Sequence, residues 1–433
     1  MAAPPDELRR PRLAERGAGA EPSAPPGECG GEATPRPPAT CVPPAAAAWQ
    51  PRSRPAHDGV RTELIPHEQR CVAIASDIFQ RLLAGDSALQ GCKSSLAAFL
   101  LEREVPPASA SCQESYELVA LGTGKAGARA GAFLEFGGRR LHDTQGLVLA
   151  RRALQRYLYK QLLLWGQQLD TPAQAHCILE LEGDGGRLGL KPGVFLHLVL
   201  AQKPSGAPSS PLVLCPGQQL LAHGPGRLAP LSWWRPAVLA SRVVSISGNA
   251  KLLRWEALGL QGALLSLFLQ PLPLTSLVLA DPWASQAQLR APCPVLPPLP
   301  PPYDTQRPAH VFQGPPMAPP PARSQPPALS LNWCLGDKAV EVVDGAMGRV
   351  LPSPLCPAGC PQPSRLCKAA MLSYFRHAAT MLSQPHLLAL PTYRQAKDHA
   401  EAYQSAKAQF SAHLARSSLG NWPQKQLVDN FPS

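Results

Sequence analysis

Residues 144–165 contain the pattern that most restricts how this chain can fold. Their apolar side chains recur at intervals of three and four, which predicts one long helix with a buried stripe. The stripe consists of Leu147, Ala150, Leu154, Leu158 and Leu162. Residues 194–200 form a nearly continuous apolar run, which is typical of a central strand covered on both faces. Together these two segments predict a layered α/β domain.

The rest of the chain repeats this alternation of strands and helices. Strands are predicted near residues 118–125, 243–246, 277–280 and 329–333. Helices are predicted near residues 71–83, 251–269, 364–382 and 393–414. The order predicts a single α/β domain over residues 66–433, with a helix-rich C-terminal part.

Two proline-rich segments depart from this pattern, in a chain whose 52 prolines are about twice the usual share. Residues 1–65 lack apolar periodicity and are predicted to be disordered. Residues 292–327 are interpreted as an irregular or polyproline-II insertion in the domain. This insertion is either a simple surface loop or an exposed ligand for proline-binding modules.

The overall charge favours polyanionic partners. The formal net charge is +11 and the isoelectric point is near 9.2, which suits nucleic acid, acidic lipid or polyphosphate. A basic but inert surface is the alternative. No apolar run of about 18 residues and no signal peptide are found, so we expect an intracellular protein with no membrane span. The 12 cysteines contain no Cys-x-x-Cys pair, so free thiols are expected.

Six short motifs, in matching order and approximate spacing, resemble the deaminase domain of the adenosine deaminases that act on RNA. They are Ala-Arg-Arg at 150–152, Arg-Trp at 254–255, Gly-Leu-Gln-Gly at 259–262, Ser-Arg-Leu-Cys-Lys at 364–368, Tyr-Gln-Ser-Ala-Lys at 403–407 and Leu-Gly-Asn-Trp at 419–422. The resemblance implies a cytidine-deaminase-like three-layer α/β/α domain. It also implies a helical C-terminal extension that forms an inositol-polyphosphate pocket.

Within that superfamily the chain is most similar to a deaminase-like branch of the male germ line. This similarity implies a role in RNA processing or regulation during germ-cell differentiation (spermatogenesis), in the nucleus, the cytoplasm or both. Lys and Arg are dispersed and form no compact nuclear import cluster, so the compartment stays open.

The catalytic residues of the family are missing from this chain. A zinc deaminase needs one His and two Cys as ligands, and a Glu that moves protons. The corresponding residues are Gln145, Ser205, Gly248 and Leu147. Glycine cannot ligate a metal through a side chain, a neutral amide ligates zinc poorly, and leucine cannot carry a proton. We therefore predict a pseudoenzyme without zinc or catalytic residues.

Two arrangements would restore a metal. In one, His142 and Cys215 rebuild the site, and the chain is an active adenosine-to-inosine editing enzyme. In the other, a separate zinc site forms from Cys356, Cys360, Cys367 and His377, although free thiols suit their spacing better.

Base flipping is also expected to be impaired. The family places a Glu between two glycines, where it fills the space left by the extruded adenosine. The best match here is Pro225, between Gly224 and Gly226. Proline cannot reach into a duplex as Glu does, so efficient extrusion is not expected.

The resemblance implies that inositol hexakisphosphate is buried as a structural cofactor. Burial of a compact polyanion requires compensating cations and hydrogen-bond donors. The matching positions are Arg151, Arg152, Lys251, Arg254, Trp255, Gln261, Lys368, Tyr393, Lys397, Tyr403, Lys407, Trp422, Lys425 and Asp429.

The spacing of residues in the C-terminal part independently favours such a pocket. Steps of 4, 3, 3 and 4 place five residues near one face of a single predicted helix. They are Tyr393, Lys397, Ala400, Tyr403 and Lys407. A merely solvated face is the alternative for these five, but Arg151 and Arg152 lie in the middle of a helix whose other face must be buried.

RNA is the partner that the resemblance implies, in structured or double-stranded form, together with ribonucleoproteins and active RNA deaminases. Relatives in this branch usually carry an upstream double-stranded-RNA-binding domain, and residues 1–65 are too rich in proline to form one. Candidate contacts are therefore Lys125, Arg129, Arg139 and Arg140, unless they form a solvated loop. A further alternative is a protein-interaction scaffold that does not contact RNA.

Overall fold

The computed structural model describes most of the chain between Ile65 and Pro432. The described ranges are 65–105, 113–125, 134–167, 176–183, 186–207, 219–224, 228–281, 298–304, 308–317, 328–351, 362–423 and 428–432. They belong to one compact unit, residues 63–433. The segment predicted to be disordered lies outside the described residues, apart from Ile65, and so do Pro225, Lys425, Arg129, Cys215, Cys356 and Cys360.

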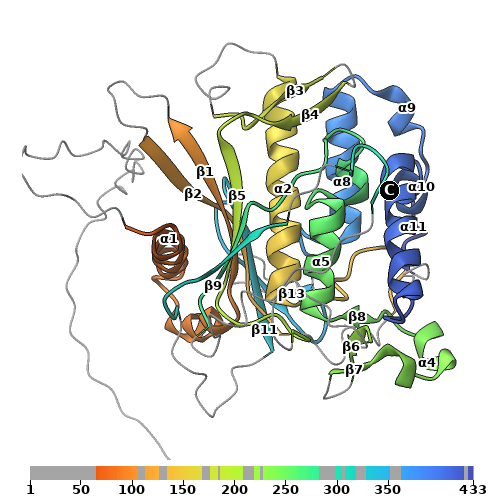
Figure 1. Ribbon diagram of the computed structural model, residues 1–433, viewed down its shortest axis with the longest axis horizontal. Coiled ribbons are helices and arrows are strands. Elements are labelled where there is room, and N and C mark those ends of the chain that lie inside the picture. Colours follow the sequence, from red (N-terminus) through yellow and green to blue (C-terminus); the bar gives the residue numbers. More distant parts are fainter. Residues whose placement is uncertain are drawn as a thin grey trace, which may run out of the picture. The chain divides into compact units, whose positions relative to one another are not determined.

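A mixed sheet of eight strands forms the centre of this unit, in the order β10-β9-β5-β1-β2-β11-β12-β13 (Figure 1). The strands are β1 (Ala97–Val105), β2 (Gln113–Gly122), β5 (Val194–Leu200), β9 (Ser276–Leu279), β10 (His310–Gln313), β11 (Leu329–Cys334), β12 (Glu341–Asp344) and β13 (Arg349–Val350). The central strand β1 is antiparallel to β2 and β5, whereas β5, β9 and β10 run parallel. The predicted α/β fold is confirmed, and the structure shows that its sheet is mixed.

Helices cover both faces of the sheet, so the unit has three layers (Figure 1). The first face carries α1 (His67–Leu82) and the 3-10 helix η1 (Ser87–Ser95), and the second carries α2 (Gly146–Gly166) and α8 (Lys368–Met381). Side chains of β1 alternate between two apolar cores, as strand geometry requires. Ala98 and Leu100 pack with α1, whereas Phe99 and Leu101 pack with α2.

The remaining elements surround α2 and α8. The helices are α4 (Pro236–Ala240), α5 (Gly248–Leu258), α6 (Gly262–Leu265), α9 (Pro385–Leu388), α10 (Tyr393–Asp398), α11 (Glu401–Arg416) and the 3-10 helix η3 (Leu231–Trp233). Two small sheets contain β3 (Leu179–Glu182) with β4 (Arg187–Leu190), and β7 (Leu228–Pro230), β6 (Leu221–His223) and β8 (Ser245–Ile246).

Two predicted helices are wrong in extent. The one expected over 251–269 ends at Leu258, because Gly259 adopts a φ of 76°, which favours glycine and stops a helix. The one expected over 393–414 is divided between α10 and α11. At this break the side-chain amide of Gln404 donates to the Lys397 carbonyl oxygen at 2.7 Å, so a side chain replaces a helical backbone donor.

The proline-rich segment 292–327 also differs from the prediction where it is described. Residues 310–313 form strand β10 rather than irregular chain, and they pair in parallel with β9. This tetrapeptide, His-Val-Phe-Gln, has the β-branched and aromatic residues that suit a sheet.

Two further observations concern the described residues. None of their helices is long and apolar enough to cross a membrane. Their cysteines Cys71, Cys92, Cys177, Cys334 and Cys367 are all buried and free.

Candidate functional site

Three of the four positions that the family resemblance assigns to the metal centre and its catalytic carboxylate lie together where α2 and α5 begin. Gln145 is the residue before α2, Gly248 is the first residue of α5, and Ser205 follows β5. The Ser205 hydroxyl oxygen lies 2.8 Å from the Gly248 backbone nitrogen and 3.5 Å from Gln145 Oε1. The fourth position, Leu147, is buried in the first turn of α2.

A buried ion pair lies beside these residues. Lys251 Nζ is 2.8 Å from Asp143 Oδ2, and Ser245 donates to the same carboxylate oxygen at 2.7 Å. Gln145 donates through Nε2 to Ser245 Oγ at 2.8 Å, which joins the pair to the former ligand position. Burial lowers the pKa of Lys251, and the adjacent Asp143 opposes that change. Lys251 therefore neutralises Asp143 here and does not line the basic cavity described below.

His223 completes this network and was not foreseen from the sequence. Its Nε2 lies 3.0 Å from Ser205 Oγ. His223 belongs to β6, so this contact depends on how β6 packs beside the chain that follows β5. Burial, with a smaller contribution from Lys251, lowers the pKa of His223 to about 4. The ring is therefore neutral at physiological pH and can accept the hydroxyl hydrogen of Ser205.

The donor set at this site does not suit zinc. Structural and catalytic zinc sites use at least three His, Cys or carboxylate ligands. Among the described residues here, no three such side chains bring their ligand atoms within 4.8 Å of one another. Asp143 is engaged by Lys251, while the Ser205 hydroxyl contacts His223, Gln145 and the backbone nitrogen of Gly248. The arrangement is a hydrogen-bonded polar cluster.

A basic cavity of about 170 Å³ lies between α2, α8 and the C-terminal helices. Eight of the residues predicted to bind a polyphosphate line it. They are Arg151, Arg152, Arg254, Gln261, Tyr393, Lys397, Tyr403 and Lys407. Gln155, Tyr159 and Met371 also line it and were missed, because they match none of the residues that the resemblance assigns to the pocket. The lining contains no Asp or Glu among the described residues.

Several polar atoms of this cavity are buried without a hydrogen-bond partner among the described residues. They are Arg151 Nε, Arg152 Nη2 and the Tyr159 hydroxyl. Burial lowers the pKa of Arg151 to about 10, although Tyr403 opposes this effect. Burial, followed by the proximity of Arg254 and Lys397, lowers the pKa of Lys407 to about 8. Orphaned donors beside uncompensated cations fit a bound polyanion.

Apart from Lys251, the other described positions of the predicted pocket lie around the residues that line it. The Arg151 guanidinium lies over the Trp255 ring at 4.8 Å, and the Arg254 guanidinium lies over the Trp422 ring at 4.7 Å. Asp429 binds both Lys368 and Lys397, and its Oδ2 lies 2.7 Å from Lys397 Nζ.

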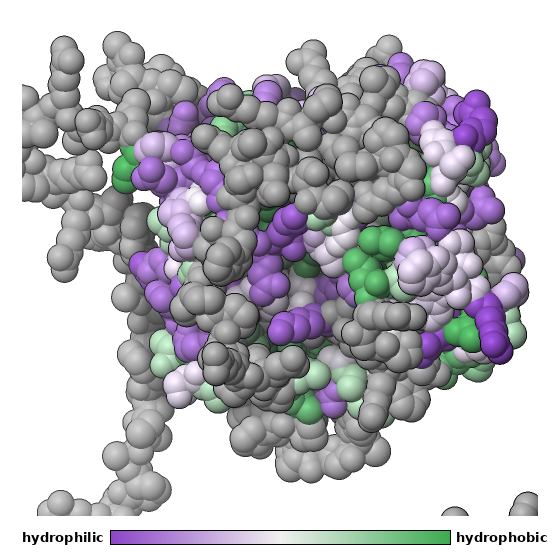
Figure 2. All heavy atoms as spheres, turned by 60° about the horizontal axis from the view of Figure 1, so that its bottom comes forward, coloured by the Kyte–Doolittle hydropathy of each residue, from purple (hydrophilic) through white to green (hydrophobic). Residues whose placement is uncertain are grey.

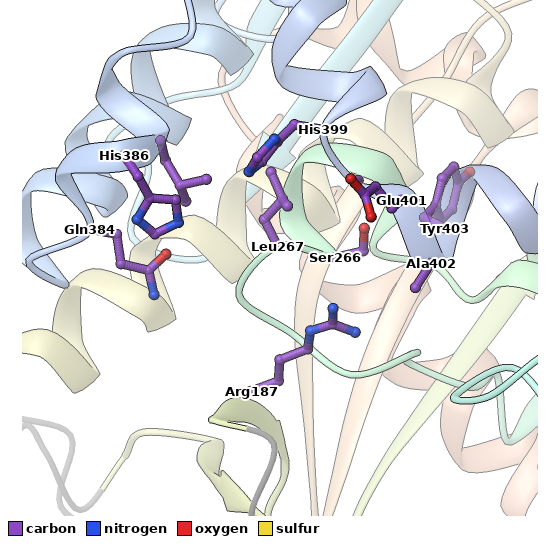
Figure 3. Close-up of a pocket in the computed structure, with 11 residues that line it drawn as sticks. Arg187, Ser266, Leu267, Gln384, His386, His399, Glu401, Ala402 and Tyr403 are labelled. Atoms are coloured by element: carbon purple, nitrogen blue, oxygen red, sulfur yellow. The ribbon is translucent and has the colours of Figure 1, made fainter.

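A second, larger cavity of about 460 Å³ shares Tyr403 with the basic one (Figure 3). Figure 3 shows the Arg187 side chain directed into this cavity, with Gln384 and His386 on one side of the space and Glu401 on the other. Because Glu401 lines it together with Arg187, this cavity lacks the uniform positive charge of its neighbour.

The face on which α2 and α5 begin carries exposed basic and aromatic groups. Hydrophilic side chains gather near the middle of this face (Figure 2). Lys125 and Arg139 are exposed, whereas Arg140 is partly buried. Trp233, in η3, is 68% exposed, and Arg242 lies over the neighbouring Trp234 ring at 5.9 Å. The sequence Trp233-Trp234-Arg235 could have predicted a surface on which nucleic-acid bases stack, but no such prediction was made from it.

Comparison with known proteins gives one family. The model of the adenosine-deaminase (editase) domain matches residues 120–225 and 225–426. The double-stranded RNA-specific editase Adar of Drosophila melanogaster is 28% identical over 324 residues, which cover 69% of this chain and 46% of that protein. The double-stranded RNA-specific adenosine deaminase of Rattus norvegicus is 26% identical over 407 residues, which cover 84% and 32% respectively. The chain therefore spans less than half the length of these curated relatives.

Proposed function

Because the chain belongs to the adenosine-deaminase (editase) domain family, we propose that it is a catalytically inactive member that associates with structured RNA. The observation that carries this proposal is the contact of Gln145, Ser205 and Gly248 at the start of α2 and α5. The resemblance assigns these three positions to zinc ligands, and none offers a side chain suited to zinc.

The chemistry of adenosine deamination supports the inactive assignment. Attack on the adenine ring requires a metal-activated water and a carboxylate that transfers protons. At the position that the resemblance assigns to this carboxylate, Leu147 supplies only a buried alkyl group. His223 contacts Ser205 and Asp143 is paired with Lys251, and among the described residues these two do not converge with a third His, Cys or carboxylate ligand.

The test is inosine formation on a perfectly paired RNA duplex, with the Drosophila editase as the positive control. We expect no inosine above the level of a protein-free sample at any enzyme concentration. Inosine that accumulates in proportion to this chain, and that disappears after chelation, would show an active enzyme with a rebuilt metal site.

Inositol hexakisphosphate is the cofactor that we assign to the basic cavity. The orphaned donors of Arg151, Arg152 and Tyr159 suit phosphate oxygens, and Arg254 and Lys407 add positive charge. When bound, such a polyanion supplies the negative charge that the lining lacks. Purified, dialysed protein should therefore contain phosphorus, with about six atoms per bound molecule. Protein without phosphorus, or with the same content after Arg151→Met and Lys407→Met, would contradict this assignment.

RNA binding is proposed on the face that carries Lys125, Arg139 and Trp233. The curated relatives are described as double-stranded RNA-specific, and base stacking on an exposed tryptophan contributes about 1–3 kcal/mol. We expect duplex RNA to bind in a salt-dependent manner, and Lys125→Glu with Trp233→Ala to weaken binding at least ~10-fold. The matched control, Lys338→Glu with Leu181→Ala, changes an exposed lysine and an exposed apolar residue elsewhere. Equal loss in both double variants would place the RNA elsewhere.

The biological setting follows from the similarity to the germ-line, deaminase-like branch. We assign the chain to RNA processing or regulation during spermatogenesis, in ribonucleoprotein complexes that include active RNA deaminases. Immunoprecipitation from testis extract, with and without nuclease, tests this setting. Partners that are lost after nuclease treatment support an RNA-linked role, whereas partners that all persist support a protein scaffold.

A further inference from the structure

A second polar cluster lies on the opposite face of the sheet, between α1 and the central strands. It consists of His67 at the start of α1, Glu102 on β1 and His197 on β5. Glu102 shares the α1 side of β1 with Ala98 and Leu100, because alternate residues of a strand face the same way. The cluster is therefore separated by the sheet from Gln145 and Ser205.

The three side chains converge on one point. Glu102 Oε2 lies 3.0 Å from His197 Nε2 and 3.7 Å from His67 Nδ1. All three ligand atoms lie within 4.8 Å of one another. In a tetrahedral zinc site with bonds of about 2.0–2.1 Å, neighbouring ligand atoms are about 3.4 Å apart. The two distances to Glu102 bracket that value.

Ser276 contacts both imidazole rings at the nitrogens that do not face Glu102. Its hydroxyl oxygen lies 3.0 Å from His67 Nε2 and 2.8 Å from His197 Nδ1. A serine oxygen can accept a hydrogen bond from each ring, which leaves the lone pairs of His67 Nδ1 and His197 Nε2 directed toward Glu102. Metal-binding histidines commonly donate their second N–H in this way.

One atom of the cluster lacks a hydrogen-bond partner among the described residues. His197 is 2% exposed, and its Nε2 makes no hydrogen bond despite lying 3.0 Å from Glu102 Oε2. Two acceptor atoms at this separation repel each other unless a proton or a cation lies between them. The Tyr116 hydroxyl, 3.1 Å from His67 Nδ1, can instead turn its hydrogen toward Glu114 Oε2 at 3.3 Å.

The geometry points to a zinc site formed by His67 Nδ1, Glu102 Oε2 and His197 Nε2, which fastens α1 to the central sheet. Two imidazoles and a carboxylate are a ligand set that zinc uses, with water or a fourth side chain completing the tetrahedron. The Cys71 sulfur, one helical turn from His67 and 3.7 Å from His67 Nε2, is the nearest thiol. The His67 side chain is 22% exposed, so the ion has a route to the site.

The site is structural, because its ligands join segments that are distant in sequence and lie across the sheet from Gln145 and Ser205. Zinc bound to the folded chain alone stabilises it by mass action. We therefore expect added zinc to raise the thermal midpoint of the metal-free chain. Stoichiometric zinc here is compatible with the absence of deaminase activity.

The test uses the full chain stripped with a chelator and titrated with zinc alone, then with cobalt as a spectroscopic probe. We expect stoichiometric binding and the intense visible bands of tetrahedral cobalt. Glu102→Gln and His197→Asn should each abolish binding, and Ser276→Ala should weaken it about 10- to 100-fold. His310→Gln, at an exposed histidine on the neighbouring strand β10, is the matched control and should bind normally.

Wild-type chain that binds no zinc or cobalt, with an unchanged thermal midpoint, would overturn the proposal without requiring any variant to fold. Folded Glu102→Gln and His197→Asn proteins that bind as tightly as wild type would also overturn it. Zinc that is lost from those variants but kept by Ser205→Ala would place the ion at His67 rather than at Gln145, independently of any inosine measurement.

Discussion

The hydroxyl oxygen of Ser205 accepts a hydrogen bond from the backbone nitrogen of Gly248 at 2.8 Å. Residues 43 positions apart are thus held together at the point where the family resemblance places two cysteine ligands. At these two positions the chain presents a serine hydroxyl and a glycine backbone nitrogen.

This proximity predicts that zinc binding can be restored. Gln145→His, Ser205→Cys and Gly248→Cys together should supply three converging ligands and produce stoichiometric zinc. A Cβ at position 248 would lie 3.1 Å from Pro204 Cβ and 3.2 Å from the Ser205 nitrogen, so only a small adjustment is required. The measurement is zinc per chain in a Glu102→Gln background, which removes the site proposed at His67.

The control for this restoration is Ser205→Cys alone, which should gain no zinc because a single thiolate does not form a site. A folded triple variant without zinc would show that the three positions do not correspond to the family's ligands.

The ion pairs of Asp429 predict a large loss of stability on Asp429→Asn. Although burial opposes ionisation, Lys397 and Lys368 lower the pKa of Asp429 to about 2 from 3.8. Its contribution is therefore present above about pH 4 and is lost as the pH falls toward 2. Urea denaturation at pH 7 should show a loss of about 2 kcal/mol, because two partly buried ammonium groups lose their counterion.

Asp398→Asn is the matched control for this prediction. Asp398 forms an exposed ion pair with Arg394, and such pairs contribute about 0.5 kcal/mol. Equal losses in the two variants would contradict the special role of Asp429.

The lowered pKa of Lys407 predicts that the free energy of unfolding of the anion-free chain rises at alkaline pH. Its pKa falls from 10.5 to about 8 on folding, so between these values the unfolded chain binds more protons than the folded chain. The free energy of unfolding should consequently increase over this interval. Lys407→Met should remove that increase in urea denaturation series, whereas Lys338→Met, at an exposed lysine, should retain it.

The raised pKa of Glu256 predicts that the free energy of unfolding falls, rather than rises, as the pH increases. Burial raises its pKa to about 7 from 4.5, although Oε1 accepts a hydrogen bond from the Ala309 nitrogen at 2.8 Å. The folded chain then binds more protons than the unfolded chain between these values, so stability falls as the pH rises from 4.5 to 7.

Glu256→Gln should therefore stabilise the chain above pH 7 by about 1–3 kcal/mol and have little effect near pH 4. Thermal unfolding at both pH values measures the difference. Glu104→Gln, at an exposed position of β1, should show no such pH-dependent gain; a similar gain there would contradict the role of burial.

Local patterns in the sequence predicted much of the architecture. The stripe from Leu147 to Leu162 specified α2, and the apolar run 194–200 specified β5, because both depend on periodicities within one segment. The order of motifs along the chain also singled out Gln145, Ser205 and Gly248 as three positions of one predicted site, and these residues are in contact in the folded chain.

Contacts between distant segments were decided only by the tertiary structure. The sequence grouped Lys251 with the polyphosphate residues, whereas folding places it against Asp143. Tyr393 and Tyr403 reach one cavity from two separate helices rather than from a single helical face. His67, Glu102 and His197 share no sequence motif. They meet because α1 packs on the face of the sheet that also carries Leu100 of β1 and Val199 of β5. Periodicity reports which face of an element is buried, but the identity of the residue opposite that face depends on how the layers pack.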